Sequence, residues 1–532
     1  MRASRLIGGL VVLALVAVVV FAVVQSFQQD AGGSSGHPTS SASASASADP
    51  SLAATPTPDA GATAPPTPDL APFYSQQLSW QPCRDKFECA TLEVPVDYQD
   101  PTGDTIELAL LKDPADDPAH RVGSLVVNPG GPGAPGTSYA ENSSFAFRQV
   151  LRDDFDIVGF DPRGTGQSDP VDCVSDAELD SLTAADPDPD TAAEGQQLQQ
   201  SYEAFFQGCM QHSDSLISHV TTVEAARDMD VLRAALGEAQ LLYFGASYGT
   251  KLGATYADLF PDKVGRMVLD GAVDLSIDSR ELSLQQAGGF EVALRSYVQN
   301  CVDDGDCFLG DTVDDGLKTI QDLIASIEDH PLPTQDDTRP LAVGNAFYGL
   351  VAPLYNRDYW SILDQALQMA LDGDGSLLLR LSDLYESRND DGTYSDNSAE
   401  AILAINCLDD PYSITADQVP DQLPAFEQES PTFGDVFAWG LVSCHGVQAK
   451  ATDKDPKIDA AGAAPIVVVG TTRDPATPYQ WAVHLADQLQ SGVLVSRDGD
   501  GHTGYNSGND CVDGAVEDYL VDGTVPEDGL EC

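Results

Sequence analysis

The chain has 532 residues, more than one compact core usually holds, so the sequence predicts at least two packed units. It carries 26 Lys and Arg residues against 84 Asp and Glu residues, a formal net charge of −58. Proteins bind duplex nucleic acid and anionic membrane surfaces through cationic side chains. This charge therefore excludes nucleic acid as a partner and disfavours binding to an anionic membrane surface. The hydrophobic content of 42% is ordinary for a folded protein, so the acidity belongs to a solvated surface.

The N-terminus has the features of an export segment. Arg2 and Arg5 precede an uncharged apolar run over residues 6–24, and a membrane span takes about 20 such residues. A cleaved signal peptide usually has a shorter apolar core followed by a small-residue cleavage site, and no clear site follows Ala22. We favour an uncleaved signal anchor within residues 1–26, with a cleaved signal peptide as the alternative. Either way the rest of the chain is expected outside the cytoplasm, touching the membrane only through this apolar segment.

A tract rich in Ser, Ala, Pro and Thr follows over residues 27–72. Such a tract buries too little apolar area to offset its ordering entropy, so we expect a disordered linker. The folded part is therefore predicted to begin near residue 73.

From residue 73 onward, short β-rich runs alternate with helical patterns. Several runs, such as 466–469, are continuously apolar, as strands covered on both faces by helices should be. The pattern predicts an α/β fold with an eight-stranded, mostly parallel sheet. The expected strands are 90–96, 105–111, 123–128, 155–160, 240–244, 265–269, 465–470 and 492–496.

Residues 275–460 lack a convincing strand pattern and contain several helical periodicities. The expected helices cover 282–302, 317–327, 360–372 and 376–387. We interpret 275–460 as a mostly helical cap inserted between the sixth and seventh strands. The sheet domain would then consist of residues 73–274 and 461–532.

The strongest chemical signal is the sequence Gly-Ala-Ser-Tyr-Gly over residues 245–249. An apolar strand runs into it and a helical pattern follows, which is the setting of a nucleophile elbow. The glycines on either side of Ser247 suit such a turn, because neighbouring chains can approach it closely only where no Cβ is present. The motif predicts Ser247 as a nucleophile, and its alternative reading is a glycine-rich loop.

A serine hydroxyl needs a base, and the base needs an orienting acid, in the chain order Ser, Asp or Glu, His. Of eight histidines, only His484 and His502 follow the candidate acid, and His484 lies in a helical pattern. His502 stands in a loop after the last strand, so we predict it as the base. Asp474 follows the preceding strand and is the predicted acid. Asp498 and Asp500 are poorer rivals because they lie beside His502 in sequence.

A developing oxyanion needs preorganised donors. One is expected from the backbone N–H of Tyr248, directly after the nucleophile. The second should come from the Asn-Pro-Gly-Gly-Pro-Gly loop over residues 128–133, where we favour Gly131 and place Gly130 next. No metal or other cofactor is expected, because no Cys-x-x-Cys or compact Cys/His cluster occurs.

These motifs also carry a family resemblance. Residues 128–133, the sequence Asp-Pro-Arg-Gly-Thr-Gly-Gln-Ser at 161–168, the stretch 221–274 and the Asp474 segment resemble secreted actinobacterial tripeptidyl aminopeptidases. These enzymes form part of the proline iminopeptidase-like branch of the α/β-hydrolases, peptidase family S33. The resemblance implies an α/β-hydrolase fold and serine peptidase chemistry at a free N-terminus. Relatives typically begin the oxyanion motif with His, whereas this chain has Asn128.

The ten cysteines fit an exported protein, in which disulfides persist. We expect pairing between sequence neighbours, although sequence alone leaves other connectivities open. The expected pairs are Cys83 with Cys89, Cys173 with Cys209, Cys301 with Cys307, Cys407 with Cys444, and Cys511 with Cys532.

The sequence thus predicts an exported serine hydrolase, an aminopeptidase that releases short peptides. The alternatives are a carboxylesterase acting on lipid or other small esters and a non-catalytic surface-binding protein. An aminopeptidase must offset the desolvation of a substrate ammonium group, which calls for a carboxylate in the cap. We predict Asp409 or Asp410 for that role, because a Cys407 bridge would hold both rigid. The oligomeric state is left open.

Overall fold

The computed structural model describes residues 64–532, apart from residues 85, 214, 337 and 453–456. The predicted signal anchor and most of the predicted linker lie outside the described residues, so both stay predictions. Each helix within the described residues is too short or too polar to span a bilayer.

A single mixed sheet of ten strands forms one half of the molecule, in the order β1-β2-β3-β5-β4-β6-β7-β8-β9-β10. In this order, the first four strands, β1, β2, β3 and β5, pair antiparallel, and every later pair from β5 to β10 is parallel. The strands are β1 (Gln81–Cys83), β2 (Phe87–Pro95), β3 (Thr105–Asp113), β4 (Gly123–Asn128), β5 (Phe155–Phe160), β6 (Leu241–Ala246), β7 (Val264–Asp270), β8 (Ile466–Arg473), β9 (Gly492–Asp500) and β10 (Leu530–Glu531).

All eight predicted strands are present, but the predicted number was two too low. The additional strands, β1 and β10, lie at the two edges of the sheet and have three and two residues. Strands this short show no hydrophobic alternation, and they are held by pairing with β2 and β9.

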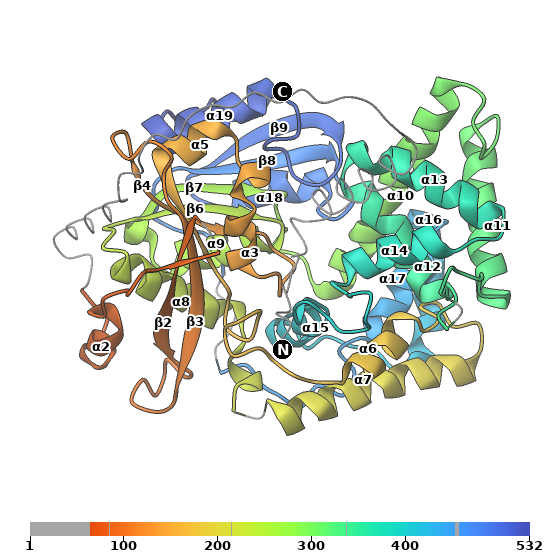
Figure 1. Cartoon of the computed structure of the whole chain (residues 1–532), viewed down its shortest axis with the longest axis horizontal. Coiled ribbons are helices and arrows are strands. Elements are labelled where there is room, and N and C mark those ends of the chain that lie inside the picture. Colours follow the sequence, from red (N-terminus) through yellow and green to blue (C-terminus); the bar gives the residue numbers. More distant parts are fainter. Residues whose placement is uncertain (1–63, 85, 214, 337, 453–456) are drawn as a thin grey trace, which may run out of the picture.

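Helices cover both faces of the sheet, which explains the continuously apolar strands (Figure 1). Along β4, Val126 packs into the core under one face, while Leu125 and Val127 pack into the core under the other. The first face is covered by α8 (Thr222–Ala235), α9 (Tyr248–Leu259) and α18 (Tyr479–Gln488), with the short α2 (Ala71–Tyr74) beside α8. The second face is covered by α3 (Gly136–Glu141), α5 (Gln149–Asp154) and α19 (Asp510–Asp522), and α4 (Ser143–Ala146) links α3 to α5.

A helical cap lies between β7 and β8 in the sequence and forms the right half of the molecule in Figure 1. It has its own apolar core, with Leu294, Leu350 and Leu363 buried at its centre. Its helices are α10 (Ser279–Asp304), α11 (Val313–Asp329), α12 (Val343–Val351), α13 (Trp360–Leu371), α14 (Ser376–Tyr385), α15 (Ser398–Asp409), α16 (Leu423–Glu429) and α17 (Gly434–Trp439). A mostly parallel sheet with this insertion is the α/β-hydrolase fold, as the sequence predicts.

A second helical segment joins the cap from within the first part of the sheet domain. Helices α6 (Asp176–Thr183) and α7 (Ala192–His212) lie between β5 and α8 in sequence and run along the cap in Figure 1. On α7, Gly195 lies against the buried ring of Trp439, which a Cβ at this position would approach to 2.3 Å. The cap is therefore built from two separate chain segments, which a linear reading of the hydrophobic pattern does not reveal.

All five predicted disulfides are present, and no described cysteine is free. Two of them hold the cap region: Cys173–Cys209 ties α7 to the segment after β5, and Cys407–Cys444 ties α15 to the segment after α17. Disulfides of this number are typical of proteins outside the cytoplasm.

Candidate active site

Ser247 stands at the turn between β6 and α9 in a strained backbone conformation. Its φ of 57° and ψ of −127° lie outside the regions that L residues usually adopt, which is typical of a nucleophile elbow. Its N–H donates to the Asp270 carbonyl at 2.8 Å, and its own carbonyl accepts from the N–H and hydroxyl of Thr250. These bonds fix the turn at the N-terminus of α9, where the helix dipole favours negative charge.

His502 and Asp474 lie in direct contact. Both Asp474 carboxylate oxygens are 2.9 Å from His502 Nδ1. Asp474 is buried and also accepts from the N–H groups of Ala476, Thr477 and Thr503, at 3.0, 2.8 and 3.1 Å. These donors hold the carboxylate in place, aimed at the imidazole.

The two ring nitrogens of His502 have different surroundings. His502 Nε2 is buried and has no hydrogen-bond partner among the described residues. Burial lowers the pKa of the imidazole, but the charge and hydrogen bond of Asp474, with the charge of Asp270, outweigh burial and raise that pKa above its usual value. No hydrogen bond joins Ser247 Oγ to His502 within the described part of the chain. The two residues contact adjacent positions of one segment: Ser247 bonds to Asp270, and a Cβ at Gly271 would lie 3.1 Å from His502 Cε1.

The rival residues have other partners. Asp498 and Asp500 both pair with Arg473, at 2.8 and 2.7 Å, and Asp500 also binds Ser296. His484 lies on α18, is 42% exposed, and pairs with Asp274 at 2.6 Å. The structure therefore brings Asp474 to His502, as the chain order predicts, and places the rivals in separate ion pairs.

Asp270, at the end of β7, is a positioning residue that the sequence analysis missed. Its buried carboxylate accepts from the N–H groups of Gly504 and Tyr505 at 2.7 and 2.9 Å, which fixes the loop that carries His502. Burial raises its pKa to about 6, although these two hydrogen bonds oppose that effect. Asp270 is the acidic residue that ends the apolar strand sequence Arg-Met-Val-Leu-Asp. A search for acidic residues at strand ends would therefore find it.

The predicted oxyanion loop follows β4 and lies against the nucleophile. Gly130 and Gly131 have φ values of 100° and 107°, and a Cβ on Gly130 would lie 2.8 Å from the Ser247 Cβ. The Gly130 N–H donates to Asn128 Oδ1 at 3.0 Å, whereas the Gly131 N–H donates no hydrogen bond within the described part of the chain. This difference favours Gly131 over Gly130 as an oxyanion donor. Asn128 Nδ2 is buried without a partner in the same part of the chain.

Asp409 and Asp410, predicted to bind a substrate amine, both have partners within the protein. The buried Asp409 carboxylate lies 2.7 Å from Lys251 Nζ and accepts from the N–H and hydroxyl of Thr222. Because Lys251 is on α9 and Thr222 begins α8, Asp409 joins the cap to the helix that follows Ser247. Asp410 accepts from Ser279 at 2.5 Å. Neither is the unpaired carboxylate that the prediction requires, and their substrate role stays a prediction.

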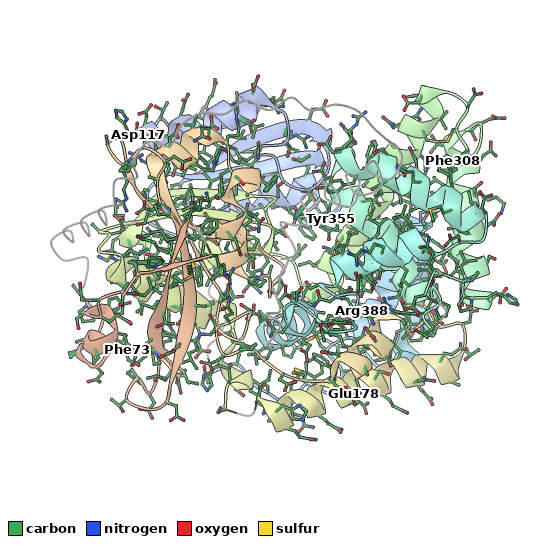
Figure 2. The ribbon with its side chains drawn as sticks, in the orientation of Figure 1. Phe73, Asp117, Glu178, Phe308, Tyr355 and Arg388 are labelled. Carbon is green, nitrogen blue, oxygen red and sulfur yellow. A yellow bond between two sulfur atoms is a disulfide. The ribbon has the colours of Figure 1, made fainter. Side chains whose placement is uncertain are left out.

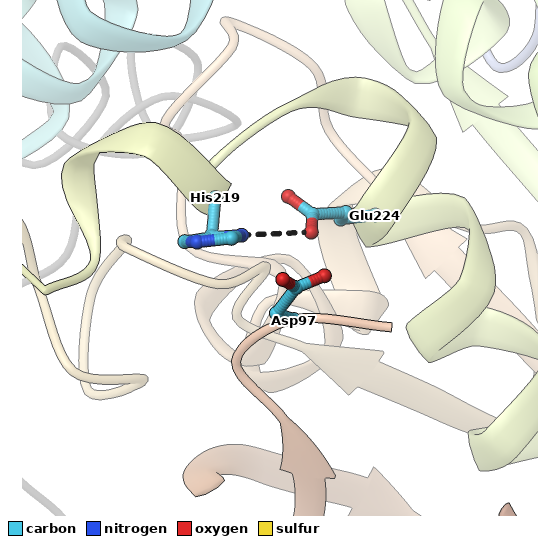
Figure 3. Close-up of side chains that lie close together, drawn as sticks. All are labelled: Asp97, His219 and Glu224. Carbon is cyan, nitrogen blue, oxygen red and sulfur yellow. Dashed lines mark hydrogen bonds and ion pairs between the residues drawn. The ribbon is translucent and has the colours of Figure 1, made fainter. Parts of the chain in front are cut away.

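One trio of possible metal ligands occurs among the described residues, formed by Asp97, His219 and Glu224 (Figure 3). His219 Nδ1 lies 3.0 Å from a Glu224 oxygen, and the other Glu224 oxygen lies 3.7 Å from the Arg163 guanidinium. Arg163 is itself buried and bound to Asp228 at 2.7 Å. The Arg163 guanidinium already compensates the negative charge of Glu224. We therefore interpret the trio as part of an ion-pair network that braces the 161–168 loop.

Comparison with known proteins identifies the family of this chain. A family model described as TAP-like protein matches residues 430–532. The tripeptidyl aminopeptidase of Streptomyces coelicolor is 30% identical over 468 residues, covering 86% of each chain. The serine protease Hip1 of Mycobacterium tuberculosis is 37% identical over 482 residues, covering 87% of this chain and 92% of the relative. The chain belongs to the tripeptidyl aminopeptidase-like family.

Another relative in this similarity range carries a different name. Carboxylesterase B of Mycobacterium tuberculosis is 38% identical over 483 residues, covering 87% of this chain and 91% of the relative. Members of the tripeptidyl aminopeptidase-like family are therefore named both for peptide and for ester hydrolysis. The segment matched by the family model, 430–532, includes Asp474 and His502.

Proposed function

We propose that this protein is an exported serine peptidase that releases short peptides, of about three residues, from free N-termini. The observation that carries the proposal is the combination of the strained Ser247 elbow with the Asp474–His502 pair on neighbouring strand ends. Ser247 is the proposed nucleophile, His502 the base and Asp474 the orienting acid.

In the proposed reaction, His502 Nε2 takes the Ser247 proton while Oγ attacks the scissile carbonyl. The carbonyl oxygen becomes an oxyanion, which the N–H groups of Gly131 and Tyr248 stabilise. The protonated His502 gives its proton to the leaving amine, leaving an acyl-enzyme. Water, activated by His502, then hydrolyses the ester and restores Ser247. No step of this sequence calls for a metal or other cofactor.

A panel of substrates tests this function. The proposal expects faster turnover of tripeptidyl anilides with a free N-terminus than of aminoacyl, dipeptidyl or N-acetylated tripeptidyl anilides. The second candidate function, carboxylesterase activity, is favoured by the relative named carboxylesterase B. Turnover of short esters without turnover of any anilide would establish that alternative, and turnover of neither would support a non-catalytic binding protein.

The proposed location is outside the cytoplasm, with residues 6–24 as a membrane anchor. The five disulfides support export, and the anchor itself lies outside the described residues. Fractionation of the native protein followed by N-terminal sequencing tests the anchor: an intact N-terminus in the membrane fraction is expected, and a soluble protein starting after residue 24 would contradict it.

A further inference from the structure

Asp500 is a buried carboxylate at the end of β9 with partners in both halves of the molecule. It lies two residues before His502 and is 7% exposed. In the sheet domain, Arg473 Nε donates to Asp500 Oδ1 at 2.7 Å. In the cap, Ser296 Oγ donates to the same oxygen at 2.5 Å, and an Arg357 N–H donates to Asp500 Oδ2 at 3.3 Å. The carboxylate therefore joins the strand that leads to the base to the cap.

The cap also contacts His502 itself. The His502 N–H donates to the Tyr355 carbonyl at 2.7 Å, and the two rings meet edge-on with their centroids 5.3 Å apart. A Cβ on Gly501 would lie 2.9 Å from the same carbonyl, so the backbones of the cap and of the base loop are in close contact. Figure 2 shows Tyr355 where the cap faces the sheet domain. The base is thus held by the cap as well as by the sheet domain.

The cap residues that make these contacts are braced against one another. Tyr355 and Arg357 lie in the segment between α12 and α13, whereas Ser296 lies on α10. Arg357 donates to Asn300 Oδ1 at 2.8 Å, and the Tyr355 ring lies 5.8 Å from the ring of Phe290. Asn300 and Phe290 also belong to α10. The contacts of the cap with the base loop therefore come from one connected part of the cap.

The neighbouring carboxylate of Asp498 lacks this connection. Asp498 pairs with Arg473 at 2.8 Å and accepts from the Thr472 hydroxyl at 3.0 Å, and its side chain is 77% exposed. Both partners belong to β8, and within the described part of the chain Asp498 makes no hydrogen bond or ion pair with the cap. Asp498 and Asp500 thus share Arg473, and of the two only Asp500 reaches the cap.

We propose that Asp500 is a positioning residue through which the cap holds His502, so that the base is aligned only while the cap is docked on the sheet domain. This inference rests on the proposed function. The sheet domain supports the loop after His502 through Asp474 and Asp270, which accept N–H groups of residues 503–505. The cap supports the side before it, through Asp500 and the His502 N–H. Without the cap contacts the base is held from one side, and a displacement of about 1 Å lowers a rate by about 10²-fold.

Two variants break this connection from opposite sides. Asp500→Asn removes the charge that Arg473 and Arg357 bind. The cap-side double variant, Ser296→Ala with Arg357→Gln, removes the cap partners of the carboxylate and leaves its partner in the sheet domain. Each should lower kcat by at least about 10-fold for anilide and ester substrates alike and change KM by less than about twofold, because the base serves every substrate. Asp498→Asn is the matched control and should leave kcat unchanged.

Proton NMR of the resting protein tests the position of the base without turnover. His502 Nδ1 lies 2.9 Å from both Asp474 oxygens, and a proton in such a charge-assisted hydrogen bond gives a signal at low field. The signal is identified by its loss in His502→Gln. Asp500→Asn and the cap-side double variant should shift or broaden it, and Asp498→Asn should not. Circular dichroism confirms that each variant is folded at the temperature of the measurement.

The outcomes separate this inference from the proposed function. An unchanged kcat or an unchanged low-field signal in the cap-side double variant would overturn the inference and leave the peptidase proposal intact. A loss confined to Asp500→Asn would show that Asp500 acts through Arg473, and an equal loss in Asp498→Asn would show a general effect of charge; either result overturns the role of the cap. If the unmodified protein hydrolyses neither anilides nor esters, the peptidase proposal fails, and the NMR signal still decides whether the cap positions His502. If Asp500→Asn does not fold, the cap-side double variant decides the question.

Discussion

At the scale of single residues, the candidate site depends on three side chains held by backbone hydrogen bonds. Asp474 and Asp270 each accept N–H groups of the loops they position, and Ser247 is held through its own backbone. Such bonds leave few alternative side-chain orientations, which is what preorganised catalysis requires.

Ser247→Ala should lower the rate of hydrolysis by about 10⁴-fold or more, because it removes the proposed nucleophile. Ser247 is only partly buried, and its hydroxyl makes no hydrogen bond within the described part of the chain, so the thermal unfolding midpoint should not change. Turnover of the preferred anilide or ester, with circular dichroism as the folding control, checks both expectations. Normal turnover by this variant would contradict the serine mechanism.

Asp474→Asn should lower the rate by about 10⁴-fold, because Asp474 is the proposed orienting acid and loss of that acid has this effect in serine triads. It should also change the pH profile. The base must be neutral, so activity rises with pH through the His502 pKa, which Asp474 raises above its usual value against the effect of burial. Without that charge, the rising limb of kcat/KM moves to lower pH. A fully active variant would instead direct attention to Asp498 or Asp500.

At the scale of elements, turns and contacts between helices decide whether the residues of the candidate site meet. The oxyanion loop approaches the elbow so closely that Gly130 has no room for a side chain, and α15 is tied to α8 and α9 through Asp409. Both contacts join segments that are far apart in sequence.

Gly130→Ala should lower kcat by at least about 10²-fold, because misplacement of reacting groups by about 1 Å has that effect. A Cβ at this position would lie 2.6 Å from the Ala246 carbonyl, so the loop or the elbow must move. Gly373→Ala is the control for backbone strain alone, since Gly373 also has positive φ (92°) but no atom within 4 Å of a Cβ. Similar loss in both variants would refute the steric explanation.

Asp409→Asn should destabilise the protein by about 3 kcal/mol, because it removes the buried carboxylate that binds Lys251 and Thr222. Its kinetic effect should be the same for free and N-acetylated substrates. The exposed pair Lys318–Asp322 provides a control, and Asp322→Asn should change stability by less than about 1 kcal/mol. A selective rise of KM for free peptides in Asp409→Asn would restore the substrate role that the sequence predicts for this residue.

At the scale of the whole molecule, the cap and the sheet domain have separate apolar cores, joined by α7, α15 and covalent bridges. The large negative net charge destabilises the compact state through self-repulsion, which unfolding relieves. Disulfides that close long loops should therefore matter most for stability.

Replacing Cys407 and Cys444 together by Ser should lower stability by roughly 4 kcal/mol, on chain-entropy grounds, because the bridge spans a sequence separation of 37. The Cys301–Cys307 bridge has a separation of 6, and its double replacement should cost about 2 kcal/mol. Thermal unfolding of both variants gives the order of the two effects. The reverse order would show that native contacts, rather than loop length, set the contribution of these bridges.

The amino-acid sequence by itself determined the eight longer strands, the helical insertion, and the choice of Ser247, His502 and Asp474 as candidates. These features are local: apolar runs, a glycine-flanked serine, and polar residues directly after strands. Local patterns are visible in sequence because they concern neighbours along the chain.

Only the tertiary structure decided which distant groups meet. It brought Asp474 rather than Asp498 or Asp500 to His502, and it paired Asp409 with Lys251. It also added α7 to the cap and two short edge strands to the sheet. The physical reason is that the charge state and availability of a carboxylate depend on which donors and cations fold against it, and those come from segments far away in the sequence.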